Sequence, residues 1–394
     1  MTIQEARETV VLAGKRLVES GLIARTWGNV SCRISSSHFV ITPSGRDYLS
    51  LTPEEIVEVA ISDCSYNSSI KPSSEKGVHA EVYKLHPEIQ FVIHTHQKHA
   101  SAVSALMLDA INVSKDYPSL GGQVICAAYG LPGTKKLRRG VADALARSKG
   151  KAVIMKNHGA LCFGQNYEEA FRVAHELESA CERFIREKYA EISKEPDTDF
   201  GQIGCFALSK LTGNKVTTAD KGPVLSCSSE RTANGFCLHI NGESLDYSLE
   251  HFPLPDYPEA EIHHDIYKKH KNINHIIHTG TPVVFAVSCA GIKVLPLLDD
   301  FAQIAGISVG NVEMNNNRIL TALKKASAVM LKNNGALCCG SAKGDAEAVN
   351  MVLEKNCEAL VSAALFGKVK PINRFECRLM RFVYLKKYSK QAHI

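Results

Sequence analysis

Three histidines in this chain have the spacing and surroundings of metal ligands. His94 and His96 stand two residues apart at the end of a run rich in β-branched and aromatic residues over 89–96, and His158 follows an apolar run over 152–155. Successive side chains of a β-strand alternate between faces, so a strand here directs His94 and His96 the same way. Three protein ligands with one open position are typical of a catalytic zinc, whereas a structural zinc is usually enclosed by four. We therefore predict a three-histidine site for zinc or another divalent metal.

The pair formed by His94 and His96 also has a simpler interpretation, in which two partly buried histidines only hydrogen-bond their neighbours. The setting of His158 favours the metal site, because this residue also emerges at the end of a predicted strand and is followed by a glycine. We expect the three imidazoles to converge on one ion.

Glu75 is the candidate for proton transfer. It follows Ser73 and Ser74 and precedes a helical pattern of apolar residues over 78–85, which is also the pattern of a capped helix start. The predicted helix leads directly into the strand that bears the first two histidines, so its N-terminal end is expected to lie near the ion. A carboxylate beside a metal-bound substrate is placed to move a proton.

The composition is that of an ordinary globular protein. The chain has 394 residues, 45% hydrophobic and 22% charged, which is enough for two cores and predicts two domains. The formal net charge of +5 is scattered along the chain, so we expect no nucleic-acid partner. A charged N-terminus and the lack of a long apolar run predict neither secretion nor a membrane span. The 13 cysteines are mostly single and lie among apolar residues, which is typical of buried thiols and predicts a cytoplasmic protein.

The sequence contains an internal duplication. Residues 156–162 return as residues 332–338, and each copy is followed by a helical apolar stripe. An earlier set returns with a constant shift of 184 positions: Glu75, His79, Tyr83, Ile93, His94 and Thr95 recur as Glu259, His263, Tyr267, Ile277, His278 and Thr279. We predict two tandem domains, over residues 1–195 and 196–394, divided near the polar, proline-containing segment 191–199.

The second copy lacks most of the proposed ligand set. Gly280 and Asn334 stand where the first copy has its second and third histidines, so only His278 remains. The second copy also has no clear counterpart of residues 26–31 and 72–74. We therefore predict a catalytic first domain and a degenerate second domain without a complete metal site.

An ordered series of motifs in the first copy resembles the class II aldolase/adducin family, whose enzymes include the fuculose-phosphate and rhamnulose-phosphate aldolases. The motifs are Gly28-Asn29-Val30-Ser31, Ile41-Thr42-Pro43-Ser44-Gly45, Lys71-Pro72-Ser73-Ser74-Glu75, Val92-Ile93-His94-Thr95-His96 and Asn157-His158-Gly159. The resemblance implies an α/β fold for both domains, each a central, largely antiparallel sheet flanked by helices. Because family enzymes assemble as cyclic tetramers, two fused copies suggest a homodimer whose four domains form a pseudo-tetramer.

The resemblance also implies roles for single residues. His94, His96 and His158 would bind zinc, and Glu75 would be the acid/base. A phosphate pocket would be formed by small or hydrogen-bonding residues: Gly28, Asn29, Ser44, Gly45, Ser73 and Ser74. Small residues let backbone N–H groups approach an anion, although each of these fragments alone is also typical of a plain turn. Family enzymes further use a tyrosine from a neighbouring subunit, and Tyr117 lies in the corresponding region, although its spacing is a poorer match.

The activity that the resemblance implies is a reversible retro-aldol cleavage of a sugar (ketose) phosphate. Zinc would bind the carbonyl and hydroxyl oxygens and stabilise the enediolate left when the C–C bond breaks, while Glu75 moves the proton. Two alternatives stay open. One is a metal-dependent decarboxylase, dehydratase or epimerase of the same family, and the other is a non-catalytic, adducin-like interaction protein.

Overall fold

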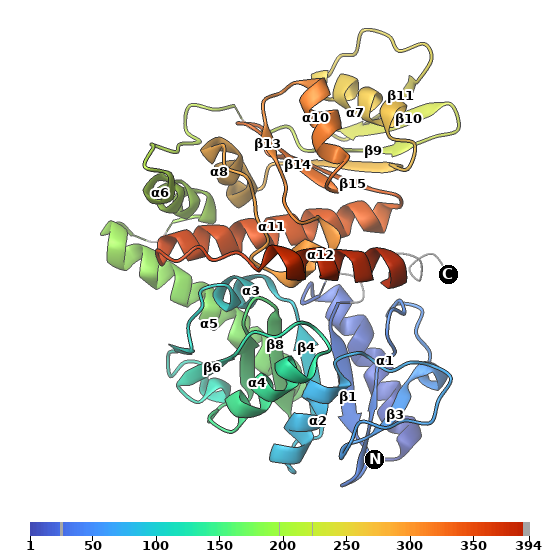
Figure 1. Ribbon diagram of the computed structural model, residues 1–394, viewed down its shortest axis with the longest axis vertical. Coiled ribbons are helices and arrows are strands. Elements are labelled where there is room, and N and C mark those ends of the chain that lie inside the picture. The colour runs from blue at the N-terminus through green and yellow to red at the C-terminus, as the bar shows by residue number, and fades with distance from the viewer. Residues whose placement is uncertain (24–26, 197, 223, 389–394) are drawn as a thin grey trace. The chain divides into compact units, whose positions relative to one another are not determined.

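The computed structural model describes residues 1–23, 27–196, 198–222 and 224–388 (Figure 1). The chain divides into two compact units. The first unit holds Met1–Lys188 together with the described residues 385–388, and the second holds Tyr189–Tyr384. This division falls a few residues before the boundary expected at 195/196, and the separate roles given to the two domains stay a prediction.

The first unit is built on an eight-stranded sheet with the order β3-β2-β1-β4-β8-β7-β6-β5. All neighbouring strands are antiparallel except β6 and β7, which are parallel. The strands are β1 Asn29–Arg33, β2 His38–Ile41, β3 Val57–Ala60, β4 Phe91–Thr95, β5 Ala110–Asn112, β6 Gln123–Ala127, β7 Ala152–Met155 and β8 Gly159–Gly164. The helices are α1 Ile3–Glu19, α2 Lys76–Leu85, α3 Lys98–Ser104, α4 Lys135–Leu145 and α5 Tyr167–Ser193, with 3-10 turns at Pro53–Glu55 and Pro118–Leu120.

The second unit has a seven-stranded sheet with the order β11-β10-β9-β12-β15-β14-β13. Its strands are β9 Cys227–Arg231, β10 Gly235–Ile240, β11 Glu243–Ser248, β12 His275–Thr279, β13 Asn311–Val312, β14 Ala328–Leu331 and β15 Ala336–Gly340. Its helices are α6 Phe200–Thr212, α7 Pro258–Lys269, α8 Pro282–Ala290, α9 Asp299–Ile304, α10 Asn316–Leu323, α11 Lys343–Leu365 and α12 Arg374–Val383. A π-helical turn over Tyr384–Tyr388 begins at the last residue of this unit and continues into residues assigned to the first. The two sheets share one strand order, apart from β5, which confirms two tandem domains of a single largely antiparallel α/β fold.

The predicted periodicities explain why these segments fold as they do. Strands β4, β7 and β8 lie inside the first sheet and are buried at every position, as their continuous apolar sequences require. Helices α2 and α4 contact each other and join one hydrophobic core with the sheet, through Val78 and Val82 of α2 and Leu137 and Val141 of α4. The apolar stripe expected on α5 is buried at Ala170, Val173, Leu177 and Cys181, whereas its last member, Phe184, is only half-buried.

Two further expectations concern the whole chain. All 13 cysteines are free, and none is exposed, as the scattered spacing predicts. Within the described ranges no helix combines the length and apolar character needed to cross a membrane.

Candidate metal centre

The three predicted ligands come from the centre of the first sheet. His94 lies in β4, where the backbone pairs with Asn29 of β1 on one side and Leu161 of β8 on the other. The expected strand over 89–96 is shorter in the structure and ends at Thr95, so His96 stands just beyond it. His158 occupies the tight turn between β7 and β8, as its position after an apolar run predicts.

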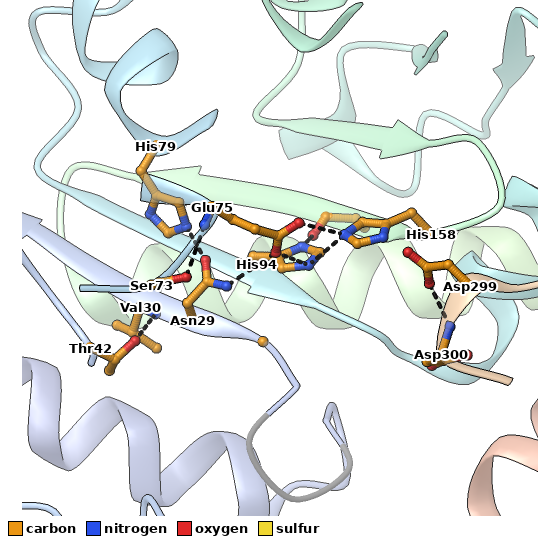
Figure 2. Close-up of polar contacts among 12 residues, drawn as sticks. Asn29, Val30, Thr42, Ser73, Glu75, His79, His94, His158, Asp299 and Asp300 are labelled. Carbon is orange, nitrogen blue, oxygen red and sulfur yellow. Dashed lines mark hydrogen bonds and ion pairs between the residues drawn. The ribbon is translucent and has the colours of Figure 1, made fainter. Parts of the chain in front are cut away.

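The three imidazoles converge. Their nearest ligand atoms all lie within 4.8 Å of one another, and all three side chains are buried. The Nε2 atoms of His94 and His158 are 3.1 Å apart (Figure 2). Two nitrogens bound tetrahedrally to one zinc at its usual bond length would be roughly 3.3 Å apart, so this pair matches the geometry of the ion.

A hydrogen bond to the backbone determines which ring nitrogen of His94 faces the other two histidines. Nδ1 of His94 lies 2.9 Å from the carbonyl oxygen of Ala160, which can only accept, so Nδ1 carries the proton. Nε2 is therefore the nitrogen that faces His158 and the other groups of the cluster. This is the arrangement that typically orients a metal-binding histidine.

Glu75 lies beside the same two imidazoles. Its carboxylate oxygens are 3.1 Å from Nε2 of His94 and 3.0 Å from Nε2 of His158 (Figure 2). The residue immediately precedes α2, but its side chain makes no capping hydrogen bond, so the simple capping interpretation does not explain its position. Burial raises the pKa of a carboxyl group, but His158 and His94 outweigh this effect and hold the pKa of Glu75 well below its usual range.

The residues predicted to grip a phosphate lie around the ends of the neighbouring strands. The loop after β2 pairs with the loop before α2 through two backbone hydrogen bonds. The Ser44 N–H donates to the carbonyl oxygen of Lys71, and the Ser73 N–H donates to the carbonyl oxygen of Thr42. At Gly28, φ is +132°, and a side-chain carbon would come within 2.7 Å of the His94 carbonyl oxygen. Only glycine fits there. Gly45 and Ser74 follow in the same two loops.

Asn29 has a contact that the sequence did not predict. Its side-chain amide donates to the Glu75 carboxylate at 3.3 Å and accepts from His79 at 2.5 Å. A role in phosphate binding stays a prediction for this residue, as it does for the other five.

The structure does not place Tyr117 in this cluster. It lies in the loop after the edge strand β5, four strands from β4 in the sheet order. Its role as a proton donor stays a prediction.

The second unit differs at the equivalent place. His278 of β12 presents Nε2 to the carbonyl oxygen of Asn334 at 2.9 Å, so the nitrogen that would face an ion is already hydrogen-bonded. Over the described residues, the three histidines of the first unit are the only cluster of His, Cys, Asp or Glu able to hold a metal ion.

The fold and the site define a tandem α/β protein with one candidate metal centre in its first unit. A sequence model described as the class II aldolase and adducin N-terminal domain matches residues 8–185 and 225–361, well over half of the chain. The chain therefore belongs to the class II aldolase and adducin family, and each of its units is a copy of that domain.

Individual relatives match mainly one domain's length of this chain. A 5-deoxy-D-ribulose 1-phosphate aldolase of Bacillus thuringiensis serovar kurstaki is 32% identical over 189 residues, 48% of this chain and 88% of the relative. An L-fuculose phosphate aldolase of Escherichia coli K12 is 34% identical over 166 residues, 42% and 75% of the two chains. A methylthioribulose-1-phosphate dehydratase of Yersinia pestis is 30% identical over 195 residues, 45% and 86%. A solved L-fuculose 1-phosphate aldolase is 29% identical, covers 50% of this chain and 90% of its own, and has a TM-score of 0.44.

Proposed function

We propose that the first unit is a zinc-dependent lyase that reversibly cleaves a ketose phosphate by a retro-aldol reaction. The observation that carries this proposal is the convergence of three imidazoles with one carboxylate beside them. The similarity to aldolases that act on a deoxyribulose 1-phosphate and on fuculose phosphate supports the choice of substrate class.

When bound, zinc would supply a Lewis acid that polarises the carbonyl group and takes up the negative charge of the broken C–C bond. The side chains of the protein would hold the metal and move the proton. The hydrogen bond from His94 Nδ1 to the Ala160 carbonyl oxygen would keep Nε2 of His94 directed at the metal site in every turnover. In the condensation direction Glu75, ionised because its pKa is low, would take a proton from the carbon that forms the new bond, and in cleavage it would return that proton.

The phosphate would be held by the loops that carry Ser44, Gly45, Ser73 and Ser74, next to Gly28. Backbone N–H groups and hydroxyls at such a junction form an anion-binding concavity. This arrangement predicts that a phosphorylated ketose is bound more tightly than the free sugar.

A dehydratase is the second candidate, because a methylthioribulose-1-phosphate dehydratase is 30% identical to this chain. It would use the same metal and the same type of base, but here Glu75 would take a proton from a substrate carbon and a neighbouring hydroxyl group would leave as water, with no C–C bond broken. The products separate the two reactions, since cleavage gives two carbonyl compounds and dehydration gives one.

The test combines metal analysis with product analysis. We expect the purified protein to contain zinc and to convert a panel of ketose 1-phosphates into dihydroxyacetone phosphate and an aldehyde, detected by mass spectrometry. The unphosphorylated ketoses serve as the matched control. Protein that holds no divalent metal after gentle purification, and yields no product after zinc is added back, would contradict the proposal and favour the non-catalytic, adducin-like alternative.

A further inference from the structure

We propose that His79 and Asn29 are positioning residues, which hold the Glu75 carboxylate in the orientation that its proton transfer requires. The role of Glu75 rests on the function proposed above. The positioning itself rests on a chain of buried hydrogen bonds in the first unit.

The chain of hydrogen bonds connects five side chains (Figure 2 shows its inner part). All five are at least nine-tenths buried. The bonds run from Tyr83 Oη to Ser31 Oγ at 2.7 Å, from Ser31 Oγ to His79 Nδ1 at 2.7 Å, from His79 Nε2 to Asn29 Oδ1 at 2.5 Å and from Asn29 Nδ2 to Glu75 Oε2 at 3.3 Å.

The Asn29 side chain determines the direction of the inner bonds. Its amide nitrogen can only donate and lies against Glu75 Oε2, and its amide oxygen can only accept, so it accepts from Nε2–H of His79. In a neutral His79, Nδ1 is then unprotonated and accepts from the Ser31 hydroxyl. The Ser31 oxygen in turn accepts from the Tyr83 hydroxyl. This arrangement of protons is the one that belongs to a neutral His79.

The environment of His79 supplies that neutral form. Burial lowers the pKa of His79 to about 3, so the imidazole is uncharged at neutral pH. The residues of this hydrogen-bond chain come from two elements, β1 and α2. Asn29 and Ser31 alternate along β1, and His79 and Tyr83 lie one turn apart on α2. The outer end is fixed by Arg33, whose guanidinium donates to the backbone carbonyl of Tyr83 and lies over its ring.

The second unit provides an internal comparison. Ser229 there bonds to His263 Nδ1 and to Tyr267 Oη, each at 2.8 Å, and Arg231 donates to the carbonyl oxygen of Tyr267. These residues repeat the outer part of the chain. The inner link is missing, because the residue paired with the β12 histidine is Cys227, where the first unit has Asn29.

The absence of an asparagine at this position affects the histidine and the glutamate that it would join. Nε2 of His263 and Oε2 of Glu259 are buried and make no hydrogen bond within the described part of the chain. The unit that lost its metal ligands thus keeps the part of the chain that joins its helix to its sheet, and lacks only the residue that would reach the carboxylate. We infer that the asparagine serves the site, whereas the serine, histidine and tyrosine also serve the fold.

The first test exchanges the link between the two units. Asn29→Cys should lower kcat roughly 10- to 100-fold, the usual effect of losing an outer partner of a metal site, while zinc content stays unchanged. The matched control, Cys227→Asn, should leave both kinetic constants unchanged. A raised KM with an unchanged kcat would overturn the proposal, because it would assign Asn29 to phosphate contact instead.

The second test keeps the proposal testable if Asn29→Cys does not fold. His79→Gln retains a donor and an acceptor on a neutral group, so it should recover most of the kcat that His79→Leu loses. Equal losses in the two variants would overturn the positioning role.

The third readout needs no substrate. In spectra of protein labelled with ¹⁵N-histidine, the signal that disappears in His79→Gln should belong to a neutral ring with its proton on Nε2, and a proton on Nδ1 would overturn the chain as described. If this signal is as expected but the wild-type protein cleaves no ketose phosphate, the proposed function fails while the hydrogen-bond chain stands.

Discussion

At the scale of single residues, the orientation of an imidazole distinguishes the two units. His94 and His278 occupy equivalent positions in central strands, and both are buried. His94 donates from Nδ1 to a backbone carbonyl and leaves Nε2 to the centre, whereas His278 uses Nε2 for its own backbone partner. The same residue type is therefore a candidate ligand in one unit and a structural side chain in the other.

This difference predicts the outcome of a matched pair of substitutions. His94→Ala should abolish stoichiometric zinc binding and lower kcat/KM by ~10²–10³ or more, because it removes one of three ligands of the proposed electrostatic stabiliser. His278→Ala should leave both quantities unchanged. Zinc is measured by elemental analysis and kcat/KM by product formation. Equal zinc loss in both variants would contradict the assignment.

Buried histidines also make stability depend on pH. Burial lowers the pKa of His263 to about 3, below the value of about 6.5 expected in the unfolded chain. The unfolded state thus binds a proton between these two values while the folded state does not, so stability is fully present above about pH 6.5 and is lost progressively toward pH 3.

We expect this one histidine to lower the free energy of unfolding by about 2 kcal/mol between pH 7 and pH 5. Urea unfolding at the two pH values should show that loss in the wild-type protein. In His263→Gln, which cannot titrate, the loss should be smaller by the same amount. An identical pH dependence in the two proteins would contradict this prediction.

At the scale of elements, the turn between β7 and β8 brings the third histidine to the other two. A methyl group at Gly159 would overlap the carbonyl oxygen of Thr95, so β8 can approach β4 this closely only with glycine at that position. The same approach places Ala160 where it accepts the proton of His94.

Gly159→Ala should therefore weaken both the fold and the site. Overpacking of this kind costs about 1–3 kcal/mol of unfolding free energy, and zinc affinity should fall because the two strands must separate. Gly310→Ala is the control, since the nearest atom to a side-chain carbon there is 4.0 Å away. Denaturant unfolding and a zinc titration measure the two effects. Zinc binding at wild-type affinity in Gly159→Ala would show that the turn does not set the site.

At the scale of the whole molecule, one fold is used twice and only one copy holds a candidate metal centre. The second family match ends at residue 361 and the sheet order repeats, although the ligand set does not. The fold therefore forms here both with and without the three-histidine cluster.

We propose a homodimer that contains four such domains. Native mass spectrometry should give twice the mass of one chain, and elemental analysis should give one zinc per chain, because the second unit has no metal cluster among its described residues. A monomeric mass would contradict the proposed dimer, and two zinc ions per chain would contradict the assignment of the second unit.

The sequence was sufficient to predict the elements and the types of residue at the site. The HxH spacing, the histidine after a buried strand and the glutamate before an apolar helical pattern are local signals, and the structure brings all four side chains together. The duplication was visible for the same reason, because one shift of 184 positions relates residues from 75 to 95 to their counterparts and a second shift of 176 relates 156–162 to 332–338.

Other features depend on pairing between distant segments. The match between Asn29 and Cys227 follows only from strand register, because the first strands of the two units are shifted by 198 positions, as from Ser31 to Ser229, rather than by 184. Tyr117 was chosen by position along the chain, which cannot reveal that the strand before its loop, β5, lies at the edge of the sheet.

The sequence by itself thus determined which chemical groups the protein has and which secondary structures carry them. Only the tertiary structure decided which nitrogen of each imidazole is available and which amide reaches the carboxylate. The physical reason is that a hydrogen bond depends on distances and angles between atoms, and strand pairing fixes these between residues that lie far apart in the chain.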